Sequence, residues 1–432
     1  MDRAFAEWQI RGEPEPRKPM PVALLLFIAM LTVACSKNGG QAGPAGEQNE
    51  GGAMSGGAGE KWVGTWATAP QLTEPGNLPP APGLSGNTLR QIVYVSIGGA
   101  RVRLHFSNAY GNAPLTLNAV HLALPTSGSE IAPESDRALT FGGMTSVTLG
   151  AGATVTSDPL DFALEPLTKV AVTIAFGSTP SNVTGHPGSR TRSFIAAGDT
   201  ASAAALPAPI ATEHWYYVTG VDVLTDSASH AVVTLGDSIT DGRGTTTDGN
   251  DRWPDNLSRR LRANPETSGV AVLNQGIGGN AVLSGGLGPT AVSRFQRDVL
   301  DQSGARWVIV LHGVNDIGGS SSDAVVENLI GAYEGFVAAA RDRGLRIYGS
   351  TILPFGGSQY DTEAHEASRQ AVNAWVRTPG NFDAAIDLDA AVQDPENPAR
   401  LLPAYDSGDH LHLNPAGYQR MADAIDLALF SD

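Results

Sequence analysis

The stretch Val232-Val-Thr-Leu-Gly-Asp-Ser-Ile-Thr-Asp241 decides the fold of the second half of this chain. Residues 232–235 are apolar or β-branched and predict a fully buried strand, which Gly236 then ends. Ser238 follows at the carboxyl end of that strand, the end at which parallel α/β sheets bind ligands. A lone serine at such a place is more often a turn or helix-cap residue, but the position also makes Ser238 a candidate nucleophile.

Strands and helices alternate through the rest of this half. Strand-like segments at residues 270–274, 307–311, 345–353 and 382–388 join the first strand to make five. One intervening helix is expected from Ser322, which can cap its start, to Ala340. Its apolar face is expected to comprise Val326, Ile330, Tyr333 and Val337. The alternation predicts an α/β fold in which helices cover both faces of a parallel sheet, with an active site at the carboxyl ends of the strands.

Three further motifs fall where that active site should open. The second strand is followed by Asn274-Gln-Gly-Ile-Gly-Gly-Asn280, whose glycines let backbone N–H groups approach an anion closely. The third strand is followed by Gly313-Val-Asn-Asp316, in which Asn315 offers a neutral amide donor. Near the C-terminus, Asp406-Ser-Gly-Asp-His-Leu-His-Leu-Asn414 leads into a helix that is expected to begin near Pro415.

Together these motifs supply every role that an acyl transfer requires. Ser238 can attack an ester carbonyl while His412 accepts its proton and later returns it to the leaving alkoxide. Asp409, on the same turn as His412, can hold the other nitrogen of the imidazole. The backbone N–H groups of Ser238 and Gly279 and the side chain of Asn315 can donate to the developing oxyanion. This chemistry requires no cofactor and no metal.

The four motifs resemble those of the SGNH, or GDSL-type, serine hydrolases. Gly236-Asp-Ser-Ile239 is similar to the first block of that family, Gly279 to the glycine of the second, Gly313-x-Asn315 to the third and Asp409-x-x-His412 to the fifth. The resemblance covers the C-terminal half of the chain and implies a three-layer α/β/α sandwich around a five-stranded parallel sheet. The chain as a whole is similar to bacterial secreted arylesterases or xylan-esterase-like proteins with an N-terminal β domain, which implies deacylation of esters, including acetyl groups on polysaccharide.

Residues 61–229 have a different pattern of residue types. Short segments rich in Val, Ile, Thr and Leu are separated by Gly, Asn and Pro, and residues 101–106 alternate polar and apolar side chains as an antiparallel strand does. We predict an all-β sandwich of jelly-roll type. The loop at residues 184–190 carries His186 and Arg190 on a turn stiffened by proline and glycine, and we hypothesise that it borders the active site.

The N-terminus has the features of an export signal. Two basic residues precede an apolar run, residues 20–33, that has the length of a signal-peptide core and is too short to span a bilayer. Cys35 follows Leu31-Thr-Val-Ala34, which resembles the lipobox of bacterial lipoproteins and implies a lipid anchor at Cys35, although Thr32 stands where that motif prefers leucine. A plain secretory signal cut nearby is the alternative.

We therefore expect four regions. They are a signal peptide with a lipobox at residues 1–35, a flexible Gly-rich linker at residues 36–60, a β domain at residues 61–229 and a catalytic domain at residues 230–432. The protein is expected to be extracytoplasmic, either secreted or anchored to the membrane as a lipoprotein.

Composition narrows the range of partners. A formal net charge of -16 argues against nucleic acid and against anionic membrane surfaces as electrostatic partners. The single cysteine excludes disulfides within the chain. The expected partner is a small-molecule or polysaccharide ester substrate, and membrane contact is expected only through Cys35. The sequence carries no signal for the oligomeric state.

Several other interpretations stay open. His410, His412 and Asp409 also suit a zinc site, and Asp406 is a rival to Asp409 as the carboxylate of the triad. A lipase or lysophospholipase-like activity is an alternative, although residues 354–360, a plausible cleft rim, contain no long apolar run. A non-catalytic carbohydrate-binding surface lipoprotein is an alternative of a different class. Asp237, Asp316, His312 and Trp253 are expected to have structural roles.

Overall fold

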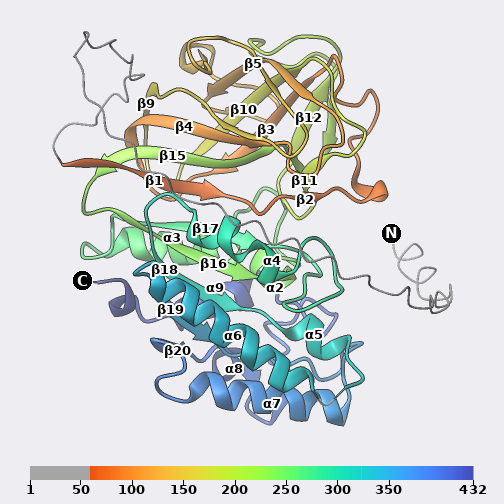
Figure 1. Cartoon of the computed structure of the whole chain (residues 1–432), viewed down its shortest axis with the longest axis vertical. Coiled ribbons are helices and arrows are strands. Elements are labelled where there is room, and N and C mark those ends of the chain that lie inside the picture. The colour runs from red at the N-terminus through yellow and green to blue at the C-terminus, as the bar shows by residue number, and fades with distance from the viewer. Residues whose placement is uncertain (1–58, 323, 432) are drawn as a thin grey trace, which may run out of the picture. The chain divides into compact units, whose positions relative to one another are not determined.

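Five parallel strands form the sheet on which the C-terminal half of the chain is built (Figure 1). A computed structural model describes residues 59–322 and 324–431. The strands are β16 (His230–Gly236), β17 (Val270–Gly276), β18 (Ala305–Leu311), β19 (Arg346–Ser350) and β20 (Ala384–Ile386). The predicted α/β fold with five parallel strands is confirmed. The predicted signal peptide, the lipobox at Cys35 and nearly all of the linker lie outside the described residues.

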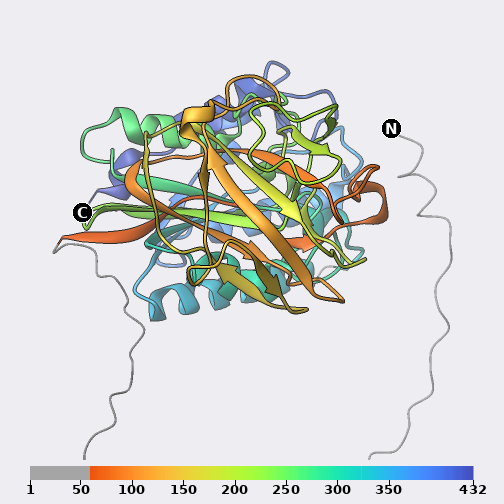
Figure 2. The same ribbon diagram turned by 90° about the horizontal axis from the view of Figure 1, so that it is seen from above.

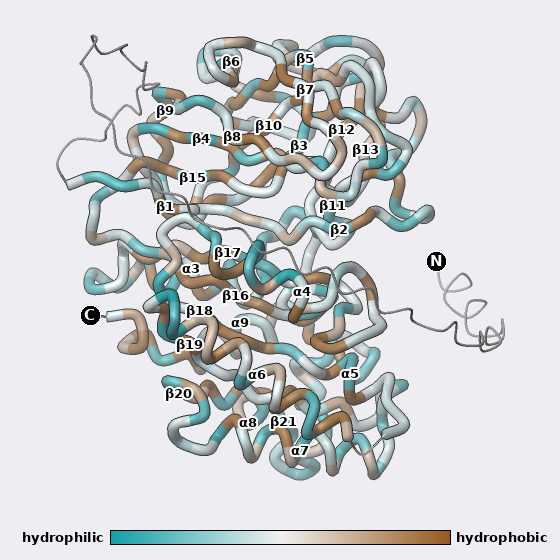
Figure 3. The backbone as a smooth tube through the Cα atoms, viewed as in Figure 1, coloured by the Kyte–Doolittle hydropathy of each residue, from teal (hydrophilic) through white to brown (hydrophobic). Residues whose placement is uncertain are grey.

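The strand that precedes Ser238 lies inside the sheet. The order of strands is β17-β16-β18-β19-β20, so β16 pairs with β17 on one side and with β18 on the other. All residues of β16 after His230 are buried, which explains why its sequence is apolar without alternation (Figure 3). Because the order of strands reverses at β16, its carboxyl end is the topological switch point at which open α/β sheets bind ligands.

The helices of this half form two groups, and the helices of each group pack against one another. One group comprises α3 (Trp253–Ala263), α8 (Leu388–Val392) and α9 (Pro415–Asp423). The other comprises α4 (Ala291–Phe295), α5 (Val314–Gly318), α6 (Val325–Asp342) and α7 (Glu363–Arg377). Trp253 is fully buried at the start of α3, as expected. Within the described ranges, no helix has both the length and the apolar character needed to cross a membrane.

The predicted start of α6 was wrong, and its predicted face is confirmed only at Tyr333 and Val337. The helix begins at Val325, because the carbonyl of Ser322 accepts the Val325 N–H at 3.2 Å in a turn that precedes the helix. Val326 and Ile330 are only half-buried and lie at the edge of the buried stripe. The residues that α6 buries are Val325, Leu329, Tyr333, Phe336, Val337 and Ala340.

Antiparallel sheets make up the N-terminal part of the described chain (Figure 2). One contains β1 (Glu60–Ala67), β15 (Val218–Asp226), β4 (Gly99–Ser107), β8 (Thr154–Thr156) and β9 (Leu160–Leu164). A second contains β13 (Ile210–Thr212), β12 (Ser193–Ala196), β3 (Thr88–Tyr94), β10 (Lys169–Phe176), β5 (Leu115–Ala123), β6 (Arg137–Ala138) and β7 (Val147–Leu149). A third, small sheet contains β14 (Trp215–Tyr216), β11 (Thr184–His186) and β2 (Gln71–Leu72). The predicted all-β region is present, and its jelly-roll connectivity stays a prediction.

The β region packs directly on the α/β region, and the described residues form one compact unit. Strand β1 contacts β17, and Gly64 donates its N–H to the carbonyl of Ser303 at 2.8 Å. A Cβ at Gly64 would lie 2.9 Å from the side chain of Leu273, so glycine permits this close approach. The Ser96 hydroxyl accepts the N–H of Val272 at 3.1 Å. The two regions therefore share an interface along the edge of the parallel sheet.

Candidate active site

The nucleophile candidate stands on a tight turn between a strand and a very short helix. Strand β16 ends at Gly236, and helix α2 (Ser238–Asp241) begins two residues later. A Cβ at Gly236 would lie 2.1 Å from the hydroxyl of Thr240, so only glycine lets the chain turn back this closely. Asp237 caps the helix by accepting the N–H of Ile239 at 3.0 Å. This turn leaves Ser238 6% exposed.

The structure brings Ser238, His412 and Asp409 together in one hydrogen-bonded relay. The Oγ of Ser238 lies 2.7 Å from Nε2 of His412, and Nδ1 of His412 lies 2.7 Å from Oδ2 of Asp409. Asp409 is fixed in turn, because its Oδ1 accepts the N–H groups of Leu411 at 3.1 Å and His412 at 2.8 Å. The imidazole is thus oriented from behind and presents Nε2 to the serine, as general-base activation of a nucleophile requires.

The electrostatics of the relay favour an ionised carboxylate. Partial burial raises the pKa of Asp409, but the hydrogen bond and charge of His412, together with the backbone N–H groups, outweigh it and hold this pKa well below its ordinary value. Nε of Arg243 also lies 3.7 Å from Oδ2 of Asp409. A carboxylate that stays charged can stabilise the imidazolium formed when His412 takes the proton of the serine.

Asn315 reaches the residue that follows Gly279, another predicted oxyanion donor. The side-chain N–H of Asn315 donates to the carbonyl of Asn280 at 2.8 Å, which places the amide beside Gly279. The Tyr360 hydroxyl donates to Oδ1 of Asn315 at 3.0 Å and fixes which way the amide faces. One of the two N–H bonds of the amide is then left for a ligand.

Backbone N–H groups complete this set of donors. Gly279 has a φ of 68°, and within the described ranges its N–H donates to no other residue. Ser238 is the first residue of α2, where backbone N–H groups have no partner inside the helix. Ile277 donates to the carbonyl of Gly236 at 3.1 Å and so ties the glycine-rich loop to the strand that carries the serine.

A buried polar layer supports these loops. Oδ1 and Oδ2 of Asp316 accept the N–H groups of Leu283 and Val282, which anchors the chain after the glycine-rich motif. Burial and the charge of Arg294 lower the pKa of His312 well below its ordinary value, which favours the neutral imidazole. Its Nδ1 accepts the N–H of Gly313 at 3.0 Å.

Two carboxyl groups in this layer are harder to ionise than usual. Burial raises the pKa of Asp316. Burial, reinforced by the charge of Asp316, raises the pKa of Asp237 to about 7. Since neither group contacts the relay directly, the expected structural roles of Asp237, Asp316 and His312 agree with their contacts.

Comparison with known proteins identifies this half of the chain. Residues 234–420 match the sequence profile described as the GDSL-like Lipase/Acylhydrolase family. The C-terminal region of the chain belongs to this family. The protein is a carboxylic ester hydrolase, in line with the resemblance found in the four motifs.

Solved structures similar to this GDSL hydrolase cover less than half of the chain. An acetylxylan esterase from Geobacillus stearothermophilus is 22% identical and covers 45% of this chain and 91% of its own, with a TM-score of 0.35. A GDSL-like lipase from Bacteroides thetaiotaomicron is 19% identical and covers 46% and 87%, with a TM-score of 0.35. An α/β hydrolase from the metagenome of Lake Arreo, Spain, is 22% identical and covers 47% and 95%, with a TM-score of 0.36. Among curated proteins, none matches the chain.

The rival residues of this GDSL hydrolase are directed elsewhere. Asp406 pairs with His410, whose Nδ1 lies 2.5 Å from Oδ2, and the His410 side chain is 54% exposed. Both ring nitrogens of His412 face Ser238 and Asp409, so the three residues of the zinc hypothesis do not converge. In the part of the chain that the structure describes, no group of three or more His, Cys, Asp or Glu side chains is arranged to hold a metal ion.

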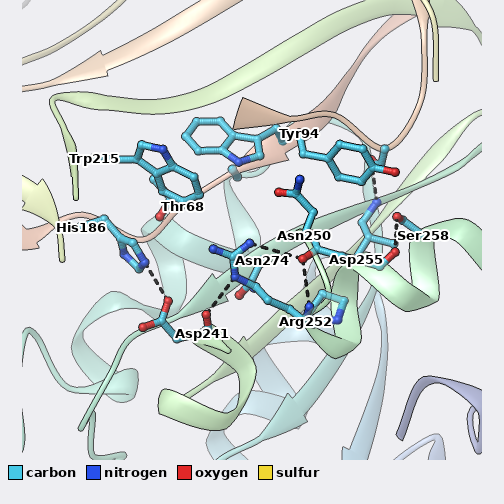
Figure 4. Close-up of a pocket in the computed structure, with 15 residues that line it drawn as sticks. Thr68, Tyr94, His186, Trp215, Asp241, Asn250, Arg252, Asp255, Ser258 and Asn274 are labelled. Atoms are coloured by element: carbon cyan, nitrogen blue, oxygen red, sulfur yellow. Dashed lines mark hydrogen bonds and ion pairs between the residues drawn. The ribbon is translucent and has the colours of Figure 1, made fainter. Parts of the chain in front are cut away.

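Sequence reasoning missed the contact of Tyr360 with Asn315 and the partner of His186. Tyr360 was predicted only as part of a cleft rim, and nothing in its sequence context links it to Asn315. The loop with His186 and Arg190 was expected at the border of the site. The structure places His186 against Asp241, at the last position of α2 (Figure 4). The only sequence signal for this contact was the presence of two functional side chains on a stiff turn.

Proposed function

We propose that this GDSL hydrolase is an exported serine esterase that removes short acyl groups, principally acetyl, from small-molecule or carbohydrate esters. The observation that supports it best is the unbroken relay from Ser238 through His412 to Asp409, with 2.7 Å at each step. The substrate class rests on the resemblance to arylesterases and xylan-esterase-like proteins, and an acetylxylan esterase is among the similar solved structures.

The proposed reaction proceeds in two halves. In the first, Oγ of Ser238 bonds to the carbonyl carbon of the ester while its proton passes to Nε2 of His412. The carbonyl oxygen becomes an oxyanion that accepts hydrogen bonds from the N–H groups of Ser238 and Gly279 and from Asn315. The tetrahedral intermediate collapses, the C–O bond to the alcohol breaks, and His412 gives its proton to the leaving alkoxide.

In the second half, water takes the place of the alcohol. His412 removes a proton from the water as its oxygen bonds to the acyl carbon, and the same donors hold the second oxyanion. The bond from the acyl carbon to Oγ breaks, the serine regains a proton from His412, and the carboxylic acid leaves. Asp409 keeps the imidazole oriented throughout and stabilises the imidazolium each time His412 holds the extra proton. Each oxyanion donor is typically worth about 3 kcal/mol of the barrier.

The first experiment is a screen of acetate release. The chain is tested on acetylated xylan, acetylated pectin fragments, O-acetylated sialic acids and p-nitrophenyl esters of increasing acyl length, beside a Ser238→Ala variant. Acetate release that depends on Ser238 and falls with acyl length supports the proposal. A preference for long acyl chains would favour a lipase or lysophospholipase instead, and cleavage of aryl acetates alone would remove the polysaccharide substrate.

Silence of the wild-type chain on the whole panel would overturn the esterase proposal and favour the carbohydrate-binding lipoprotein. Export and lipid anchoring are separate proposals that rest on the N-terminal sequence. A Cys35→Ala variant is expected to lose metabolically incorporated lipid in a bacterial host while it keeps esterase activity.

A further inference from the structure

A buried histidine of the β region contacts the helix that carries the serine. His186 ends strand β11, and its Nε2 lies 2.8 Å from Oδ1 of Asp241 (Figure 4). The two residues are only 4% and 2% exposed. Since Asp241 is the last residue of α2 and Ser238 the first, the contact joins the β region to the nucleophile through one helical turn.

Both ring nitrogens of His186 have hydrogen-bond partners. Nδ1 of His186 lies 2.9 Å from the carbonyl of Ala69, which is an acceptor, and Nε2 faces a carboxylate. Through its two ring nitrogens, His186 therefore links the chain at Ala69 to the carboxyl group of Asp241. Nη2 of Arg190, on the same loop as His186, also lies 4.0 Å from Oδ2 of Asp241, so two side chains of the β region hold this carboxyl group.

The main chain around Asp241 leaves no room for this residue to shift to another position. A Cβ at Gly188 would lie 1.8 Å from Oδ2 of Asp241, and a Cβ at Gly276 would lie 2.3 Å from its backbone nitrogen. Arg252 donates from Nε to the carbonyl of Asp241 at 2.9 Å and also bonds the carbonyl of Ser189. The turn is therefore held by the β region on one side and by the end of β17 on the other.

The space beside this contact is narrow. The cavity shown in Figure 4 is lined by Trp215, His186, Asp241 and Arg252 among others, and the volume open to the centres of water molecules is about 30 Å³. Such a volume holds only one or two waters. His186 thus faces a tightly packed interior behind the serine, and neither Ser238 nor His412 is among its hydrogen-bond partners.

We propose that His186 is a positioning residue for the hydrolytic reaction, an inference that rests on the esterase function proposed above. Its pair with Asp241 holds α2 so that Oγ of Ser238 stays 2.7 Å from Nε2 of His412. Helix α2 has four residues, too few to hold its own conformation, so its position must come from tertiary contacts. The β region is by this account part of the scaffold of the catalytic centre.

The test is a His186→Gln variant beside a His121→Gln control. Nδ1 of His121 lies 2.9 Å from Oδ2 of Asp136, a histidine–carboxylate pair within the β region that touches neither α2 nor the catalytic relay. A displacement of the serine by a fraction of an ångström is expected to lower kcat for p-nitrophenyl acetate about 10- to 100-fold in His186→Gln, with KM nearly unchanged. The rate of inactivation by phenylmethylsulfonyl fluoride, which reports the attack by Ser238 activated by His412 without release of an alcohol or deacylation, should fall in parallel.

The control separates positioning from stability. His121→Gln should lower the melting temperature but leave kcat and the inactivation rate of the folded protein at the wild-type values. If His186→Gln does the same when both are assayed well below their melting temperatures, the pair is only structural and the proposal is wrong.

A second variant covers the case in which His186→Gln does not fold. Asp241→Asn can keep a neutral hydrogen bond to Nε2, and it should lose less kcat than His186→Gln but more than the matched Asp136→Asn control. Equal kcat for Asp241→Asn and Asp136→Asn would overturn the proposal. A wild-type chain that hydrolyses no ester would overturn the esterase function itself, whereas an active wild type with unaffected variants overturns only the role of His186.

Discussion

Replacement of Asp409 by asparagine should trap His412 with its proton on the wrong nitrogen. Oδ1 of Asp409 accepts two backbone N–H groups, those of Leu411 and His412, so the oxygen of an asparagine must stay at this position. The NH2 group then takes the place of Oδ2 and faces Nδ1 of His412, which must become an acceptor. The imidazole proton moves to Nε2, and that nitrogen can no longer accept the proton of Ser238.

The expected loss of kcat is large because Nε2 of His412 must be free of a proton to accept one from Ser238. The corresponding exchange in a Ser-His-Asp triad lowers kcat about 10⁴-fold, which corresponds to about 5 kcal/mol of barrier. The fold should be retained, because asparagine has the same shape and keeps both backbone hydrogen bonds. We therefore expect kcat for p-nitrophenyl acetate to fall by three to four orders of magnitude, roughly, with little change in KM or in the circular dichroism spectrum.

The chain offers a matched control in Asp406→Asn. Oδ1 of Asp406 also accepts two backbone N–H groups, those of Gly408 at 2.8 Å and His410 at 3.0 Å, and Oδ2 faces Nδ1 of His410. The same inversion therefore occurs there, but on an exposed imidazole that is not bonded to Ser238, and kcat should stay within about fivefold of wild type. A large loss in Asp406→Asn together with near-normal activity in Asp409→Asn would refute the assignment of Asp409 to the relay.

Three further outcomes are expected. The raised pKa of Asp237, about 7 against an ordinary 3.8, means that the folded state keeps a proton that the unfolded chain releases, so stability falls as pH rises between these values. Urea unfolding should therefore show Asp237→Asn gaining up to about 4 kcal/mol relative to wild type between pH 4 and pH 8, and a loss over that range would contradict the burial argument. Gly279→Ala should lower kcat about 10- to 100-fold, because its φ of 68° disfavours alanine and the new Cβ would lie 3.2 Å from the Leu287 side chain, so that the backbone N–H is displaced; wild-type kcat would show that alanine leaves this N–H in place and would contradict the strain argument. Tyr360→Phe removes the hydrogen bond that orients Asn315 and should lower kcat about 3- to 10-fold at constant KM, whereas a change confined to KM would indicate that the tyrosine binds substrate.

The parallel sheet was predictable because its signal is local. Residues 232–235 form a continuous apolar run that ends at a glycine. Such a short run is typical of a strand in a sheet that is covered on both faces. The approach of His412 to Ser238 was predictable because Ser238 follows a parallel strand, at the end where such sheets bind ligands, and His412 lies in the motif that leads into α9. The spacing of Asp409 and His412 on one turn fixed the third contact as well.

The contacts that orient the site were not predictable for the opposite reason. The hydroxyl of Tyr360 and the amide of Asn315 are 45 positions apart, and the pair of His186 and Asp241 spans 55. No periodic pattern connects such residues, because their meeting depends on how loops close after the strands have paired. The error at the start of α6 has a different cause, since Ser322 is a good capping residue but its carbonyl closes a preceding turn instead.

Composition divides the chain between residues 229 and 230, but in the structure residues from both sides of this boundary position the serine. The sequence patterns on the two sides of this boundary differ. Ser238, however, stands on a helix of four residues, which is too short for local propensity to set its position. Contacts from both sides of that boundary supply what the helix lacks: the backbone of Gly276 lies against Asp241 from the α/β side, and Gly188 and His186 lie against it from the β side. The motifs of the C-terminal half therefore specify which atoms react, while the geometry that lets them react also depends on the β region, whether or not that region touches the substrate.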